Sequence, residues 1–213
     1  MSLQGAPLWV TFDAPQSRSL LAGEDVRYVR FTAPRDFTNV TRNLPTARQI
    51  LSEHHVVEVV STGSAVALSF LPLARATGVP VHYIESAARS DGPSLTGRIL
   101  ERIPGVRLYT QYASWANERW KLAGSVFDEF EIDKRPRSVD EGNVSIVVTL
   151  GTLDFRFDRL VKAVRDVIRP GWTVTWQTGN NTYGDLPGTV KPFVGTSEFQ
   201  ALCASADVVI SHA

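Results

Sequence analysis

One glycine turn is a place where an anion could bind. The run 144–150 is apolar and β-branched, and it ends at Gly151-Thr152. Helical spacing follows over 157–168, with apolar residues at i, i+3, i+4, i+7 and i+11 and with Asp154 as a candidate N-cap. A helix that begins behind a glycine offers backbone N–H groups to an anion, so this stretch is a candidate diphosphate seat. A strand–helix connection without a ligand fits the pattern equally well, because a Gly-Thr turn is a weak signal.

The bulk composition is that of a soluble globular protein without a nucleic-acid partner. The chain has 213 residues, and 22 Lys and Arg balance 22 Asp and Glu, so no basic excess would displace the counterions of DNA or RNA. The single cysteine, Cys203, excludes an intrachain disulfide and indicates a reducing compartment. No signal-peptide pattern is visible, and the most apolar window, 65–74, is too short to span a bilayer. We therefore expect a cytoplasmic location.

Strands and helices alternate along both halves of the chain. β-branched or alternating apolar runs predict strands, and 3.6-residue apolar spacing predicts helices. The expected strands are 8–12, 26–31, 56–60, 79–84, 107–111, 144–150, 172–176, 190–193 and 207–210, and the expected helices are 45–54, 65–77, 114–122, 155–168 and one that starts at 196 or 197. The charged stretch 131–142 predicts a linker between domains at 1–130 and 143–213. Because each crossover helix must cover a sheet face, the alternation predicts an α/β fold with parallel sheets.

Short motifs along the first half resemble a known family. They are Trp9-Val10-Thr11-Phe12, Pro34-Arg35-Asp36, Val60-Ser61-Thr62-Gly63, Tyr83-Ile84-Glu85-Ser86 with Arg89, Pro93-Ser94-Leu95-Thr96-Gly97 and Tyr109-Thr110-Gln111. In this order they resemble the membrane-associated partner of the two-component enzyme that adds the second N-acetylglucosamine in asparagine-linked glycan assembly, and its bacterial exopolysaccharide counterparts. Members usually begin with a strand and a Gly-Gly-His turn ahead of the segment that matches Trp9, which this sequence lacks.

The second half resembles the catalytic partner, a glycosyltransferase family 28 C-terminal domain of the MurG type. The matching motifs are Thr149-Leu150-Gly151-Thr152, Phe157-Asp158-Arg159-Leu160-Val161, Gln177-Thr178-Gly179 and Ser211-His212-Ala213. The family pattern continues past the Ser-His-Ala motif into a glycine-rich loop and further helices. The resemblance thus implies that two partners are fused through the linker, that the chain is truncated at both ends, and that its second domain is incomplete.

A GT-B architecture, two Rossmann-like parallel-sheet domains with ligands at the C-terminal strand ends, is what the resemblance implies. A UDP-sugar, with UDP-N-acetylglucosamine as the expected donor, would bind the second domain, and a polyprenyl-diphosphate-linked sugar the first, with inversion at the anomeric carbon. Neither a metal nor a cofactor is implied, since backbone amides can carry the diphosphate charge and no Asp-x-Asp element occurs. The implied donor-binding residues are Gly151, Thr152, Gln177, Thr178, Gly179 and His212, and the implied acceptor-binding residues are Arg35, Thr62, Gly63, Ser64 and Arg89.

Several of these residues have alternative roles. Glu85 is implied as the catalytic base or as the group that orients one, whereas pairing between Glu85 and Arg89 would only pin a loop. Arg35 would otherwise be a surface arginine. His212 would otherwise belong to a frayed terminus without a function.

The function itself also has alternatives. A non-catalytic recruiting or scaffold subunit fits the first half, and a nucleotide-sugar epimerase would share the architecture. A lipid-linked acceptor implies peripheral contact with the inner face of the membrane. The aromatic side chains of Tyr112, Trp115 and Trp120 fit either that contact or a core.

Overall fold

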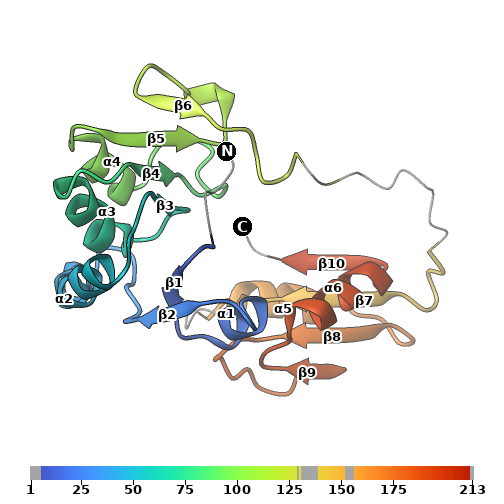
Figure 1. Cartoon of the computed structure of the whole chain (residues 1–213). Helices are drawn as coiled ribbons and strands as arrows, with labels where there is room; N and C mark the ends of the chain where they lie inside the picture. The colour runs from blue at the N-terminus through green and yellow to red at the C-terminus, as the bar shows by residue number, and fades with distance from the viewer. Residues whose placement is uncertain (1–5, 129, 131–138, 152–155, 212–213) are drawn as a thin grey trace. The chain divides into compact units, whose positions relative to one another are not determined.

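The computed structural model describes residues 6–128, 130, 139–151 and 156–211 (Figure 1). These residues form two compact units, the first from 6–13 and 24–130 and the second from 14–23 and 139–211. The short helix α1, Pro15–Leu20, groups with the second unit and contacts α6 there, although its residues lie within the predicted first domain. The predicted N-cap Asp154 and the predicted site residues Thr152 and His212 lie outside the described residues, as does most of the predicted linker.

Parallel strands form the frame of the first unit. The four-stranded sheet has the order β3-β4-β5-β6, and a separate parallel pair joins β1 to β2. Helices α3 and α4 pack against the four-stranded sheet, and α2 packs against α3 (Figure 1). The strands are β1 (Trp9–Phe12), β2 (Val26–Val29), β3 (Val59–Ser61), β4 (Val81–Ile84), β5 (Val106–Thr110) and β6 (Trp120–Leu122), and the helices are α2 (Phe37–Glu53), α3 (Ala67–Ala76) and α4 (Leu95–Glu101).

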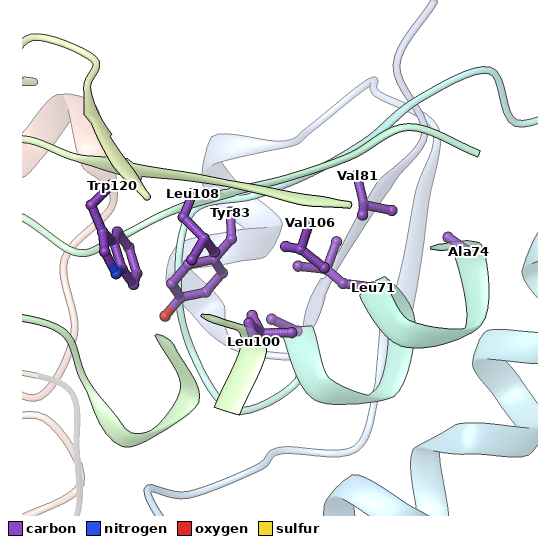
Figure 2. Packing of buried hydrophobic residues seen from close by; sticks show 9 residues of the cluster. Leu71, Ala74, Val81, Tyr83, Leu100, Val106, Leu108 and Trp120 are labelled. Atoms are coloured by element: carbon purple, nitrogen blue, oxygen red, sulfur yellow. The ribbon is translucent and has the colours of Figure 1, made fainter. Parts of the chain in front are cut away.

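Alternation along the strands builds the core of this unit. Val81 and Tyr83 of β4 share one face of the sheet, and Figure 2 shows them with Val106 and Leu108 of β5 beside the helices. His82, between the two β4 residues, therefore lies on the opposite face of the sheet. The buried cluster consists of Ala67, Leu71, Ala74, Val81, Tyr83, Leu100, Val106, Leu108 and Trp120.

The helix predicted over 114–122 is wrong. A 3-10 turn, Ala113–Trp115, is followed by strand β6, because Trp120 pairs with β5 and fills the core. The ring of Trp115 packs edge-on against that of Trp120 with centroids 5.2 Å apart. The hydroxyl of Tyr112 donates to a backbone carbonyl. These aromatic side chains therefore contribute to the internal packing of the first unit.

Helix α2 begins at Phe37, well before the predicted start at Pro45. Asp36 is its N-cap, since Oδ1 accepts a hydrogen bond from the N–H of Asn39 at 2.9 Å. The same N–H is the largest cause of a pKa below the usual range for Asp36. Pro45 lies inside the helix, where its missing N–H removes one backbone hydrogen bond. The local propensity of proline for a first turn is thus overridden by the stronger cap.

The strand order of the second unit reverses beside its first strand. Its parallel sheet has the order β10-β7-β8-β9, so the chain moves outward from β7 to β9 and then returns to the other side of β7. In open α/β sheets, ligands bind outside the carboxyl ends of the strands at such a reversal. The strands are β7 (Ser145–Thr149), β8 (Thr173–Gln177), β9 (Thr189–Lys191) and β10 (Val208–Ser211), and the crossover helices are α5 (Asp158–Val167) and α6 (Thr196–Ser205).

The predicted α/β fold with Rossmann-like parallel sheets is confirmed. In the second unit, fully buried Val148 of β7 and Trp176 of β8 pack with Val161 and Val164 of α5. Val161 and Val164 belong to the apolar stripe that the helical spacing predicts. Within the described part of the chain, no helix has both the length and the apolar character needed to cross a membrane.

Candidate functional site

Gln177 lies where three loops of the second unit leave the sheet. Its side chain is 6% exposed and accepts a hydrogen bond from Oγ1 of Thr149, the last residue of β7, at 2.6 Å. Through Nε2 it donates to the carbonyl of Gly151 at 3.0 Å and to that of Pro192, just past β9, at 3.1 Å. Both amide hydrogens are therefore used within the protein, which argues against a hydrogen bond from the side chain of Gln177 to a bound sugar nucleotide.

The backbone amides that follow Gln177 are also engaged. The N–H of Thr178 donates to the carbonyl of Lys191 at 3.1 Å, and the N–H of Gly179 donates to the carbonyl of Pro192 at 2.8 Å. These bonds fasten the loop after β8 to the loop after β9. Thr178 and Gly179 can therefore line the pocket, but their N–H groups are not free to bind a ligand.

Gly151 follows β7 in a backbone conformation that favours glycine. Its φ is 78°, in the left-handed region. Between described residues, its N–H makes no hydrogen bond, while its carbonyl is held by Gln177. The helix behind the turn, α5, begins at Asp158. Gly151 therefore has the backbone conformation of a glycine turn, and the anion seat behind it stays a prediction.

A pocket of about 380 Å³ opens past the ends of β8 and β9. Aromatic, amide and apolar groups are combined in its walls, and volumes in this range are typical of small-molecule sites. Its lining residues are Thr178, Gly179, Asn180, Asn181, Thr182, Tyr183, Val190, Pro192 and Phe193. Sequence analysis found Thr178 and Gly179 but missed the others, because they meet only where two crossovers come together.

Tyr183 is held firmly as one wall of this pocket. The N–H of Phe157 donates to its hydroxyl at 2.9 Å, and the guanidinium of Arg156 lies 4.8 Å from its ring centroid. Arg156 is itself fixed by Asp158, with Nε–Oδ2 and Nη2–Oδ1 distances of 3.1 and 2.6 Å, and this pairing holds the pKa of Asp158 below its usual range. On the other side, Tyr183 borders a polar hollow of about 460 Å³ between α5 and residue Gly184.

The predicted acceptor turn of the first unit lies beside the loop that follows β4. Gly63 and Ser64 both have positive φ, 119° and 71°, and the hydroxyl of Ser61 donates to the carbonyl of Gly63 at 3.2 Å. A Cβ built on Gly63 would lie 3.9 Å from Cβ of Ser86. Thr62 and Ser64 are exposed at this turn. The structure thus brings part of the predicted acceptor set to the ends of two neighbouring strands, β3 and β4.

Glu85, the predicted base, is buried and saturated with hydrogen bonds. It is 2% exposed. Oε1 accepts from the hydroxyl of Tyr83 at 3.2 Å and from the N–H of Ser86 at 3.1 Å, and Oε2 accepts from the N–H and hydroxyl of Ser94 at 2.8 and 2.9 Å. A base must approach a substrate hydroxyl within hydrogen-bonding distance. This environment argues against the catalytic role and favours a structural one.

Arg89 is exposed and does not pair with Glu85. No ion pair or hydrogen bond between described residues joins the two side chains, so the predicted loop-pinning pair does not form. Hydrogen bonds hold the backbone of Arg89 instead. Its N–H donates to the backbone carbonyl of Ser86 at 3.0 Å, and its carbonyl accepts from the indole N–H of Trp115 at 3.2 Å. The guanidinium remains at the surface near the strand ends.

Arg35 directly precedes Asp36, the N-cap of helix α2. It is exposed in the loop between β2 and α2, with a φ of 66° that a non-glycine residue rarely adopts. Within the described ranges, no hydrogen bond or ion pair joins it to Arg89 or to the turn 62–64. Its predicted anion-binding role stays a prediction.

Metal-binding chemistry has no obvious ligand set in the part of the chain that the structure describes. There, no group of three or more His, Cys, Asp or Glu side chains is arranged to hold a metal ion. The polar side chains that line the pocket past β8 and β9 are amides and hydroxyls, and those exposed at the turn 62–64 and the loop after β4 include hydroxyls and the guanidinium of Arg89, groups that suit anionic and hydrogen-bonding ligands.

Comparison with known proteins gives a match in structure only. No protein-family model matches the sequence, and no curated protein matches it. The crystal structure of Acinetobacter baumannii MurG is similar with a TM-score of 0.51 and 17% sequence identity, over 96% of this chain and 64% of that chain. The chain therefore spans less than two thirds of the length of that protein, and the similarity at this identity is one of fold.

Proposed function

We propose that this chain belongs to a UDP-sugar-dependent glycosyltransferase of the GT-B type, with the donor bound by the second unit. The observation that carries the proposal is the pocket past β8 and β9, at the same carboxyl edge of the sheet as the Gly151 turn after the neighbouring strand β7. The family 28 motifs and the fold similarity to MurG support it. UDP-N-acetylglucosamine is the donor that the sequence resemblance favours.

In this proposal the nucleotide occupies the pocket and its diphosphate lies toward β7. Tyr183 and Phe193 supply aromatic surface for a base, and the neighbouring asparagine side chains supply hydrogen-bonding groups. The N–H of Gly151 is proposed to bind the phosphates, and Thr152 and His212, which lie outside the described residues, stay candidate donor-binding residues. Backbone dipoles then stabilise the departing UDP.

The first unit takes the lipid-linked acceptor in the same proposal. Thr62, Gly63 and Ser64 form an exposed polar turn beside the loop of Arg89, whose guanidinium suits a diphosphate. A sugar hydroxyl of the acceptor attacks the donor directly, which inverts the anomeric carbon. The polyprenyl tail implies peripheral contact with the cytoplasmic face of a membrane.

Calorimetric titration with UDP, UDP-N-acetylglucosamine and ADP tests the donor assignment. We expect the two uridine nucleotides to bind more tightly than ADP, and Phe193→Ala to weaken UDP binding, because Phe193 lines the pocket. Absence of UDP binding by the chain, or unchanged UDP binding by Phe193→Ala, would contradict the proposal.

A recruiting role without catalysis is the second candidate for the first unit. The observation that favours it is the saturated carboxylate of Glu85, which leaves this unit without its predicted base. In that case the first unit binds the acceptor and presents it to the donor-binding unit. If Arg89→Ala bound the acceptor as tightly as the wild type does, the result would weigh against both the catalytic and the recruiting role of the first unit.

A further inference from the structure

The orientation of the Gln177 side chain is dictated by its surroundings. Two backbone carbonyls, those of Gly151 and Pro192, lie 3.0 and 3.1 Å from Nε2, and a hydroxyl donor, that of Thr149, lies 2.6 Å from Oε1. Exchanging the amide oxygen and nitrogen would place an oxygen against both carbonyls. Only an amide, with donors on one atom and an acceptor on the other, satisfies this set of partners.

The carbonyl of Pro192 shows how the loops are coupled. It accepts hydrogen bonds from Nε2 of Gln177 and from the N–H of Gly179, so the end of β8 and the loop after it both bind this carbonyl. The side chain of Gln177 also donates to the carbonyl of Gly151, and the main-chain carbonyl of Gln177 accepts from the N–H of Leu150 at 2.9 Å. One buried residue thus joins the glycine turn after β7 to a wall of the pocket.

We infer that Gln177 is a positioning residue that sets the spacing between the Gly151 turn and the pocket wall at Pro192. It acts through these two loops and touches no ligand itself. For its meaning in catalysis the inference rests on the proposed function, in which the turn holds the diphosphate and the pocket holds the nucleoside. A fixed spacing between those two subsites preorganises the site for one donor length.

Two substitutions separate polarity from volume. Gln177→Met keeps the side-chain length and removes all three side-chain hydrogen bonds, so the chain can still pack its core. Gln177→Glu keeps the shape but directs carboxylate oxygens at the carbonyls of Gly151 and Pro192. The matched control is Ser145→Ala, since Ser145 bonds Asp207 at the opposite, N-terminal edge of the same sheet, with Oγ–Oδ2 at 3.1 Å.

Amide hydrogen exchange measured by NMR tests the positioning role without any ligand. We expect Gln177→Met and Gln177→Glu to accelerate exchange at Gly179 by about tenfold or more relative to Val148 in the centre of β7, because the partner carbonyl at Pro192 loses its second anchor. Ser145→Ala should leave the ratio of the two rates unchanged. An unchanged ratio in both Gln177 variants, or an equal change in the control, would overturn the inference.

Calorimetric titration with UDP on the same three variants tests the consequence for binding. We expect both Gln177 variants to bind UDP about tenfold more weakly than the wild type and Ser145→Ala to bind normally. Normal UDP binding by both Gln177 variants would overturn the inference. If the wild type itself does not bind UDP, the donor assignment fails, and the exchange rates at Gly179 still decide whether Gln177 positions the loops.

Discussion

The two units place a buried polar residue at the same kind of position and use it differently. Glu85 follows β4 in the first unit, and Gln177 ends β8 in the second. The carboxylate of Glu85 only accepts hydrogen bonds, and its side-chain partners lie within the β4–α4 connection or on β4 itself. The amide of Gln177 both donates and accepts, and its partners lie at the end of β7, in the loop after β7 and in the loop after β9.

This difference shows how side-chain chemistry selects the structure that a residue can organise. An acceptor gathers N–H and O–H groups, which are plentiful at a helix start such as that of α4, where Ser94 is the N-cap. Carbonyls are plentiful past the ends of parallel strands, and only a donor can gather them. We therefore expect Glu85 to matter chiefly for stability and Gln177 chiefly for the geometry of the proposed donor site.

The largest stability effect is expected for Glu85→Ala. The substitution removes the buried carboxylate that accepts from the N–H groups of Ser94 and Ser86, and each donor that loses its partner costs about 1 to 3 kcal/mol. We expect a loss of about 3 kcal/mol or more in the free energy of unfolding, measured with urea. Gln177→Met serves as the comparison and should lose less. A Glu85→Ala chain as stable as the wild type would remove the contrast between the two units.

Gly97→Ala should cost about 2 kcal/mol, a typical cost of overpacking. The added Cβ would lie 2.6 Å from Oε2 of Glu85 and 2.9 Å from Cη2 of Trp120, both of them buried. Urea unfolding followed by tryptophan fluorescence measures the loss. Gly184→Ala is the matched control in the second unit, because a Cβ there meets nothing within 4 Å. Equal stability of the two variants would contradict the close packing around Glu85.

Ser94→Ala should have a smaller effect of about 1 kcal/mol, the usual value of an N-cap. Its hydroxyl accepts from the N–H of Gly97 at 3.1 Å and donates to Glu85 at 2.9 Å. Glu85 still caps the N–H of residue 94 in this variant, so part of the network survives. Circular dichroism during thermal unfolding measures the resulting decrease in Tm. A double variant with Glu85→Ala should lose less than the sum of the two single losses, because they share one network.

The smallest effect is a pH dependence that arises from His82 in the first unit. Burial, together with Arg107, lowers the pKa of this imidazole despite the carboxylate of Glu58, whose Oε1 lies 2.8 Å from Nε2. Tyr109 is its other polar neighbour, with Oη 3.1 Å from Nδ1. The folded state binds a proton at His82 less readily than the unfolded chain does. The neutral imidazole therefore contributes to the stability of the fold fully above about pH 6.5, and this stability is lost as the pH falls through the lowered pKa.

Urea unfolding at pH 7.5 and at pH 5 measures that dependence. We expect His82→Gln to lose less stability between the two pH values than the wild type does. His55→Gln, at an exposed histidine, should behave like the wild type. If His82→Gln retained the whole pH dependence, the buried imidazole would not be its source.

The sequence by itself determined the α/β class, most of the strands and the glycine turns at their ends. These features follow from local patterns: runs such as 145–149 are β-branched because both faces of a parallel strand are covered, and a turn with positive φ selects glycine at Gly151. Local reasoning was wrong for 114–122 and for the start of α2. There, pairing of Trp120 in the sheet and the cap at Asp36 outweighed helical spacing and a proline.

Only the tertiary structure decided what the polar residues at the strand ends do. Nothing in the sequence says that Ser94 will supply two of the four donors that saturate the carboxylate of Glu85, and Gln177 lies 26 residues from the carbonyl of Gly151 that it holds. The pocket past β8 and β9 likewise needs residues from two crossovers. A residue's type limits whether it can donate or accept, but its partners come from distant parts of the chain, so its role is settled only when the strands are aligned.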